Sequence, residues 1–293
     1  MQKNKIKSLI HFHFIVFIFG FTAILGSLIS ISSLSLVWYR MLIAVMCLLI
    51  ILPLLKKKLI IPKSLFFKLL FSGILISSHW VFFFKAIKAS NVSITLSILS
   101  LGAFMTSFLE PLFYKKKIIF YEVFLGLLVV LGTAIIFKTQ FKYMEGIIYS
   151  LISVIFSVLF TLINGKLVGQ ASSYTISLYE LLGGFITLSF ILILSNDFNT
   201  KLFVLKNNDF LWLLILGTIC TAYAFVVSVD VMKHLSPYSL MLSINMEPIY
   251  GILLASLFLN ESKNMSYQFY VGFSFIFLAV ILNGILKIRQ KYK

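Results

Sequence analysis

Long apolar blocks, divided by short polar segments, constrain this chain more than any other feature. A block of about 20 apolar residues matches the hydrocarbon thickness of a bilayer, which is roughly 30 Å. Only 12% of the residues are charged and 60% are hydrophobic, whereas about a quarter of a soluble domain is charged. The blocks are also too long for the short alternating strands of a membrane β-barrel. The sequence therefore predicts an all-α integral membrane protein.

Ten blocks have the length and composition of a transmembrane helix. The predicted spans are 11–29, 34–54, 66–88, 92–113, 119–137, 145–166, 174–195, 210–232, 238–259 and 266–286. Basic residues precede the first span, as in a signal peptide, but many equally apolar spans follow, so we expect it to be retained. The longest polar stretch is Ser195–Asp209. Because every connection is short, any function must lie among the helices.

Lys and Arg are distributed unevenly between the two sides that ten spans define. With a cytoplasmic N-terminus, 16 of them fall on the cytoplasmic side and 6 on the opposite side. Cytoplasmic loops are enriched in these residues, so we predict that both termini are cytoplasmic. The basic residues punctuate apolar blocks and form no continuous face, which excludes nucleic acid as a partner despite the net charge of +16.

Ten spans divide into two halves of five, residues 1–140 and 141–293. An odd number of spans per half inverts the second half relative to the first. A shift of 146 positions aligns Ser90–Ile98 with Ser236–Ile244, which favours an internal repeat. Two inverted repeats can exchange conformations so that one central site opens alternately to each side of the membrane. This pattern is the strongest link between the sequence and transport.

The chain resembles the EamA-like branch of the drug/metabolite transporter superfamily over almost its whole length. Six segments carry the resemblance: Trp38–Leu49, Ser78–Ser93, Glu122–Ile136, Leu178–Phe185, Cys220–Leu242 and Met246–Ser262. The resemblance implies ten helices in two inverted five-helix repeats around a central cavity, in a bacterial inner (plasma) membrane. Members of the family handle amino acids, sugars, nucleotides and drugs, so it implies a small metabolite, an amino acid or similar, without naming one.

The most specific part of the resemblance lies in the ninth span. In the family, the fourth helix of a repeat carries a proline in mid-span and a glutamate at its far end. Here these residues are Pro248 and Glu261, for which we expect a structural or gating role. The aligned positions of the first half hold Gly102 and Lys115, which predicts that the corresponding half-site is degenerate.

Glu247 precedes Pro248 about ten residues from either end of its span. A charged side chain near the midplane is costly, and it usually faces protein or a water-filled cavity. Proline cannot donate a backbone hydrogen bond, and broken helices persist in membranes where the freed groups line a cavity. We therefore interpret this pair as part of a cavity wall, with a proton as a candidate coupling ion. A structural carboxylate bound by a neighbouring Ser, Tyr or Asn is the alternative.

Other polar and aromatic residues within the spans complete the candidate site. Arg40 provides a planar donor group that suits carboxylates and phosphates, although an anchor to a neighbouring helix is the alternative. His79 beside Trp80 favours a pocket with a polar tip. Asp230 is expected to form a local salt bridge or gate contact. The candidate substrate-binding residues are His79, Trp80, Tyr39, Arg40, Tyr179, Glu180, Tyr223, Asn245, Glu247 and Tyr250.

Motifs for other functions are missing from the sequence. It has no Gly-rich phosphate loop, no HExxH and no nucleophile elbow, and Cys47 and Cys220 are isolated in apolar runs. We expect no enzyme activity, metal or cofactor. The hypothesis is a secondary, non-ATP-driven transporter, an exporter that works by alternating access as a monomer or homodimer. A multispan membrane enzyme or lipid-handling protein is the alternative.

Overall fold

The computed structural model describes residues 2–139, 141–206 and 208–290, and this part of the chain contains helices and no β-strand. The α-helices are α1 (Gln2–Leu28), α2 (Ser33–Leu54), α3 (Lys63–Ala89), α4 (Val92–Leu99), α5 (Leu101–Tyr114), α6 (Phe120–Thr139), α7 (Met144–Leu167), α8 (Ser173–Leu194), α9 (Asp209–Gly217), α10 (Ala224–Val231), α11 (Pro237–Ile244), α12 (Glu247–Phe258) and α13 (Tyr267–Gln290). Three short 3-10 helices, η1 (Phe141–Tyr143), η2 (Thr200–Phe203) and η4 (Glu261–Asn264), lie in connections, and a π-helix, η3 (Thr218–Tyr223), joins α9 to α10.

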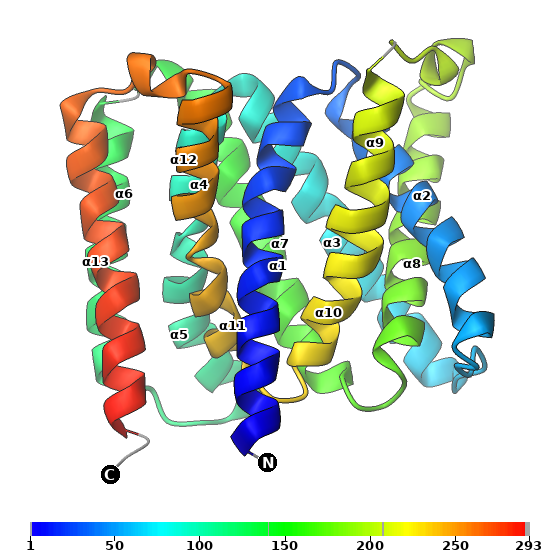
Figure 1. The fold of residues 1–293 in the computed structure, drawn as a ribbon, viewed down its shortest axis with the longest axis horizontal. Helices are drawn as coiled ribbons and strands as arrows, with labels where there is room; N and C mark the ends of the chain where they lie inside the picture. The colour runs from blue at the N-terminus through cyan, green and yellow to red at the C-terminus, as the bar shows by residue number, and fades with distance from the viewer. Residues whose placement is uncertain (1, 140, 207, 291–293) are drawn as a thin grey trace.

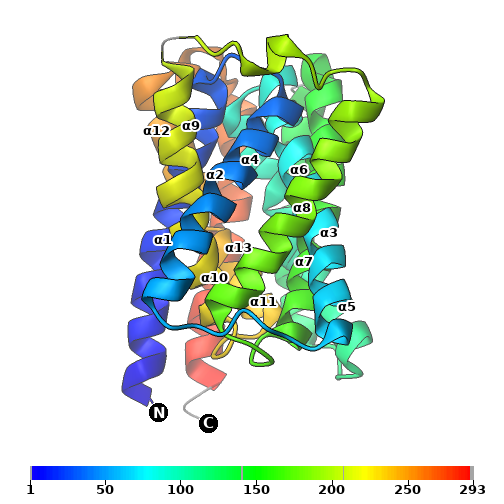
Figure 2. The ribbon, with the colours of Figure 1, turned by 90° about the vertical axis from the view of Figure 1, so that its right-hand side faces the viewer.

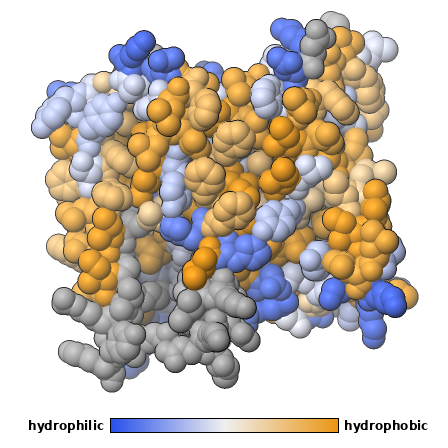
Figure 3. Space-filling view, viewed as in Figure 1, coloured by the Kyte–Doolittle hydropathy of each residue, from blue (hydrophilic) through white to orange (hydrophobic). Residues whose placement is uncertain are grey.

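The long helices run roughly parallel to one axis and form a single bundle (Figures 1 and 2). The start of α1 and the end of α13 lie at the same face of the bundle, and its cytoplasmic location stays a prediction. Much of the surface in Figure 3 is hydrophobic, whereas hydrophilic groups gather along its upper edge, at its lower right and in a patch near its centre. Lipid contacts the middle of the helices in a membrane-spanning bundle, so a largely hydrophobic surface is expected there.

Eight of the predicted spans are confirmed by length and composition within the described residues. They are Ile10–Leu28, Ser33–Leu54, Lys63–Ala89, Val92–Tyr114, Met144–Leu167, Ser173–Leu194, Asp209–Val231 and Pro237–Phe258. Helices α6 and α13 contribute the shorter apolar stretches Phe120–Ile136 and Tyr267–Ala279. The count of ten spans therefore stays a prediction.

Several helices begin at a side chain that caps the backbone. Ser and Asn favour this position because their oxygen accepts a hydrogen bond from an N–H group that the helix leaves unpaired. The capping residues are Ser32 for α2, Asn91 for α4, Ser172 for α8 and Ser236 for α11. The starts of α4 and α11, which the repeat aligns, are thus capped in the same way.

Two spans are broken near their middle. The ninth span breaks between α11 and α12, and Pro248 lies in the first turn of α12, where its missing N–H group leaves no hydrogen bond unmade. The fourth span breaks at Ser100, between α4 and α5, without a proline. The two breaks touch, because the Asn245 side-chain amide donates to the Ser100 carbonyl oxygen at 3.2 Å. The sequence predicts the break at Pro248 correctly and gives no signal for the other.

Each broken span is also capped by a carboxylate from the far end of the other. Glu261 accepts hydrogen bonds from the backbone N–H groups of Val92 at 3.0 Å and Ser93 at 2.9 Å, at the start of α4. Glu110 accepts one from the Tyr238 N–H group at 2.7 Å, at the start of α11. A helix N-terminus carries unpaired donors and a partial positive charge, so a carboxylate stabilises it. These contacts connect the two halves reciprocally.

The predicted degeneracy of the first half-site is therefore wrong. Lys115 and Asn260 end their helices in the same left-handed conformation, with φ of 53° and 54°. In the second half the capping carboxylate, Glu261, directly follows the left-handed residue Asn260. In the first half it lies about one turn inside the helix, at Glu110. A fixed shift of the sequence aligns Glu261 with Lys115 and misses this equivalence.

Helices α3 and α8 pack with almost no space between their backbones. A Cβ atom placed on Gly73 would lie 2.2 Å from the Glu180 carbonyl oxygen, and one on Gly183 would lie 2.8 Å from the Leu70 Cα atom. Small residues are common at such crossings in membranes because they let two backbones approach. This contact fixes the relative position of the polar residues that both helices carry.

We expect the substitution Gly73→Ala to lower the free energy of unfolding by about 1–3 kcal/mol, because a rigid backbone atom faces the new methyl group. Gly20→Ala serves as the control, since its Cβ would have its nearest neighbour at 3.0 Å, and its loss should be smaller. Unfolding of both variants in mixed micelles checks this. Equal losses would contradict the described helix crossing.

Candidate functional site

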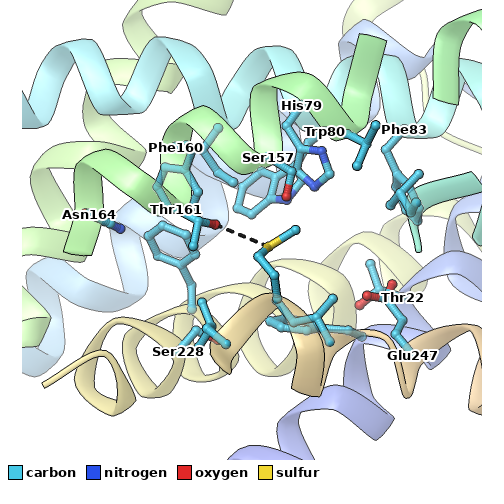
Figure 4. Close-up of a pocket in the computed structure, with 18 of the residues that line it drawn as sticks. Thr22, His79, Trp80, Phe83, Ser157, Phe160, Thr161, Asn164, Ser228 and Glu247 are labelled. Atoms are coloured by element: carbon cyan, nitrogen blue, oxygen red, sulfur yellow. Dashed lines mark hydrogen bonds between the residues drawn. The ribbon is translucent and has the colours of Figure 1, made fainter. Parts of the chain in front are cut away.

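A cavity of about 100 Å³ lies inside the bundle, beside the break between α11 and α12 (Figure 4). Its lining is mostly apolar and aromatic, with Phe19, Phe83, Phe160 and Phe225 among its residues. Its charged residues are Arg40 and Glu247, and its polar residues are Thr22, His79, Ser157, Thr161, Asn164 and Ser228. The mixture of an apolar wall and a few polar groups is typical of a small-molecule site.

Arg40 is buried and held from two sides. Its Nε atom donates to the Thr221 hydroxyl oxygen at 2.6 Å, and Nη2 donates to the Cys220 carbonyl oxygen at 3.3 Å. The guanidinium group also lies 3.8 Å from the centre of the Trp80 ring, a cation–π contact. The Nη1 atom has no hydrogen-bond partner among the described residues. Arg40 is therefore oriented rigidly and keeps one donor atom for a ligand.

The π-helix η3 provides both acceptors for Arg40. Its Thr221 hydroxyl donates to the Leu216 carbonyl oxygen at 2.6 Å, five residues back, and is left with a lone pair for Arg40. Such π-bulges occur frequently at functional sites because they release backbone groups from the regular hydrogen-bond pattern. The sequence around Thr221 contains no signal for this element, so the binding of Arg40 to it could not be foreseen.

Glu247 lies in the first turn of α12, where the helix dipole favours a negative charge. It lines the same cavity as Arg40, and the two side chains interact electrostatically. No direct ion pair within 4.0 Å joins them. The cavity is thus lined by one guanidinium group and one carboxyl group, which are not in direct contact.

His79 and Trp80 lie on one side of the cavity, and Glu247 and Thr22 lie on the opposite side (Figure 4). The His79 Nδ1 atom is 2.8 Å from the Ser153 hydroxyl oxygen, which itself donates to the His79 carbonyl oxygen at 2.9 Å. These contacts fix the imidazole ring. Of the candidate residues named from the sequence, the structure therefore brings His79, Trp80, Arg40 and Glu247 together.

Tyr39, Tyr179 and Asn245 do not line this cavity. Tyr39 donates to the Leu202 carbonyl oxygen at 3.0 Å, and Tyr179 donates to the Leu59 carbonyl oxygen at 2.9 Å. These two tyrosines connect helix ends to loops. Asn245 joins the two helix breaks, as described above.

Tyr223 and Tyr250 contact α1 outside the cavity. The Tyr223 hydroxyl oxygen lies 2.5 Å from His11 Nε2, and the Tyr250 hydroxyl oxygen lies 2.8 Å from His13 Nε2. The two pairs hold α1 against its neighbours on either side. Asp230 forms the expected local salt bridge, with Lys233 Nζ at 2.6 Å.

Glu180 lies outside the cavity lining, fully buried between α3, α7 and α8. Asn164 links it to the cavity, because this residue lines the cavity and its amide nitrogen donates to the Glu180 Oε2 atom at 3.3 Å. Sequence reasoning missed Asn164. An amide within a predicted span is the signal that could have revealed it, because such groups need polar partners.

Membrane-spanning helices around an internal cavity are the arrangement expected of a membrane transporter. Among the described residues, no group of three or more His, Cys, Asp or Glu side chains could hold a metal ion. Residues 7–138 and residues 144–285 each match the EamA-like transporter family. The chain belongs to this family and is a multi-pass membrane protein.

Two further comparisons agree with this assignment. The "Uncharacterized transporter YxxF" of Bacillus subtilis (strain 168) is 26% identical over 195 residues, which cover 64% of this chain and 60% of the Bacillus protein. A solved structure described as "Crystal structure of protein" superposes with a TM-score of 0.71 over 96% of this chain and 98% of its own, at 15% identity. The second likeness is one of fold alone.

We expect Arg40→Gln and Glu247→Gln each to destabilise the protein by about 2 kcal/mol, because each leaves the other charge buried without compensation. The loss of unfolding free energy in the double variant should be smaller than the sum of the two single losses by at least about 0.5 kcal/mol. Unfolding in mixed micelles measures all three. Arg40→Gln combined with Asp230→Asn is the matched control and should be additive. Additive losses in the first pair would contradict an electrostatic link across the cavity.

Proposed function

We propose that the protein is a secondary transporter that moves a small zwitterionic metabolite, such as an amino acid, through the central cavity. The observation that carries this proposal is the placement of Arg40 and Glu247 in one apolar cavity without a direct ion pair. A carboxylate can accept from Arg40, whose Nη1 atom has no protein partner among the described residues. An ammonium group can bind Glu247. The aromatic wall suits an apolar side chain.

The proposed mechanism is alternating access between two inverted halves, residues 1–140 and 141–293, with α6 and α13 completing ten spans. The two carboxylate caps support it, since they lie at opposite faces: α4 and α12 meet at the upper face in Figure 1, and α5 and α11 at the lower. Breaking one cap opens one face and leaves the other closed. The cavity of about 100 Å³ is small beside the roughly 300–1,000 Å³ typical of ligand pockets, which fits a closed state between the two open ones.

The direction we propose is export across a bacterial inner membrane, driven by a gradient of ions or of the substrate itself. The absence of a Gly-rich phosphate loop from the sequence supports a process without ATP. Both chain ends lie at one face of the bundle, and the excess of Lys and Arg on that side supports a cytoplasmic location.

Reconstituted protein tests the substrate class directly. Liposomes are loaded with an equimolar mixture of the twenty amino acids, and mass spectrometry reads their efflux. We expect selective loss of a subset, and a loss of rate of about tenfold or more in Glu247→Gln and Arg40→Lys, since a displaced binding charge costs at least about 1.4 kcal/mol. Glu145→Gln is the matched control and should transport normally. The Glu145 side chain is exposed and accepts a hydrogen bond from the Tyr149 hydroxyl. Wild-type efflux rates in both cavity variants would show that Arg40 and Glu247 do not bind the substrate.

The orientation is tested by labelling single cysteines in a variant without Cys47 and Cys220. Lys57→Cys lies in the loop after α2, and Lys206→Cys lies in the loop before α9; both positions are exposed. In intact cells a membrane-impermeant maleimide should label Lys206→Cys and spare Lys57→Cys until the membrane is opened. The reverse pattern would show that the termini face outward.

A further inference from the structure

A second polar cluster lies beside the central cavity, where α3, α7 and α8 meet. It consists of Ser72 on α3, Asn164 on α7, and Ser177 and Glu180 on α8, and the exposed fraction of each is 0%. Ser72 lies close to the Glu180 carboxyl group, and Ser177 lies one helical turn before Glu180 on the same face of α8. The close crossing at Gly73 brings the Ser72 side of α3 against Glu180.

The cluster contains an unusual concentration of oxygen atoms without hydrogen-bond partners. Five buried side-chain polar atoms in the described part of the chain have none, and four of them belong to this cluster: Ser72 Oγ, Asn164 Oδ1, Ser177 Oγ and Glu180 Oε1. Buried polar atoms are otherwise nearly always paired in native proteins. Four such atoms in one place leave room for a bound partner, and a cation is one that oxygen atoms can ligate.

The two serines differ from other buried serines of the bundle. Ser97 donates to the Ser93 carbonyl oxygen at 2.7 Å, and Ser150 donates to the Gly146 carbonyl oxygen at 2.8 Å. Such bonds to the preceding turn satisfy a hydroxyl inside an apolar helix. Ser72 and Ser177 make no such bond. Their oxygen atoms are thus left for another partner.

Glu180 also has no cationic partner among the described residues. The two ion pairs in this part of the chain join Lys116 to Glu110 and Lys233 to Asp230. A buried carboxylate inside a membrane requires a cation or a proton. A proton would neutralise Glu180 and, with the two serine hydroxyls, provide donors for hydrogen bonds inside the cluster. A small hard cation satisfies several oxygen ligands at once.

We propose that Glu180, Asn164 and Ser72 form a binding site for Na⁺, with Ser177 as a further oxygen ligand. One carboxylate balances one monovalent charge, whereas a divalent ion would leave a net charge inside the membrane. Asn164 connects this site to the substrate cavity, because the same side chain belongs to both. This position makes Na⁺ the coupling ion of the transporter, and this last step rests on the function proposed above.

Thermal unfolding of the full-length protein in detergent tests the site without any substrate. The unfolding midpoint is compared in NaCl and in KCl of equal ionic strength. We expect Na⁺ to raise it by about 3 °C or more in the wild type, to have no effect in Glu180→Gln, and to retain its effect in Glu247→Gln. An equal midpoint in both salts, or a rise that persists in Glu180→Gln, would overturn the proposal. So would a wild-type midpoint that responds to pH alone.

If Glu180→Gln does not fold, Ser72→Ala provides a second test of the site. Loss of one neutral ligand should increase the Na⁺ concentration for half-maximal stabilisation by about tenfold. Ser150→Ala is the matched control, since it removes a buried serine elsewhere, and should leave that concentration unchanged. If that concentration is unchanged in Ser72→Ala, Ser72 is not a ligand and the proposed site is overturned.

Amino-acid efflux is also measured with and without an imposed Na⁺ gradient. This distinguishes a failure of the proposed Na⁺ site from a failure of the proposed transport function. A response of the flux to Na⁺ supports the coupling. If the unfolding midpoint depends on Na⁺ but the amino-acid flux does not, the coupling is overturned and the result supports a structural role for the cation. A Na⁺-dependent midpoint without any amino-acid efflux supports the site and counts against the proposed substrate class.

Discussion

The reciprocal carboxylate caps are the contacts on which the arrangement of this bundle depends. A bilayer offers no water to unpaired backbone groups, so a span that breaks near its middle must find protein partners at its ends. Glu261 provides them for α4, and Glu110 provides them for α11. Because each glutamate belongs to the other half of the chain, neither half can satisfy its own broken span. The two halves are therefore joined at both faces by charge-assisted hydrogen bonds, which are stronger than neutral ones.

The same breaks create the cavity between the caps. The start of α12 places Glu247 inside the bundle, and the contact of Asn245 with the Ser100 carbonyl oxygen holds the two breaks together. Across the cavity, the π-helix η3 fixes Arg40 against Trp80. Both charges are thus held by irregular backbone, which a membrane tolerates only where it is buried in protein or lines a cavity.

Hydropathy alone predicts most of the fold. Eight of the spans, their order and the common face of the chain ends follow from apolar block length and the positions of Lys and Arg. The break at Pro248 is also predictable, because proline cannot continue the hydrogen-bond pattern of a helix. The break at Ser100 and the π-helix at Thr221 are not, since both arise from tertiary contacts with residues more than a hundred positions away.

The candidate site was predictable in its charges and less so in its geometry. Glu247, His79 and Arg40 stand out because polar groups are costly inside a membrane span, and all three line the cavity. The tyrosines do not, because aromatic residues in membrane helices also serve as packing and anchoring groups. Asn164 was not predicted because it lies close to the end of α7, where polar residues are common, although it lines the cavity and contacts Glu180.

Arg40 and Glu180 show how the two halves of the chain differ in the charged group that they contribute. They occupy similar positions in the second helix of each half, α2 and α8, and both are buried. Arg40 lines the cavity with a donor atom that lacks a protein partner, whereas Glu180 lies behind Asn164 among oxygen atoms that lack one. One half thus provides a positive group suited to an anionic part of a substrate, and the other provides a negative group suited to a cation. In the proposed mechanism the cation compensates Glu180, whereas Arg40 and Glu247 compensate each other until the two ends of a zwitterionic substrate bind them. Asn164 contacts Glu180 and lines the cavity, so it is the side chain through which we propose that the cation favours substrate binding.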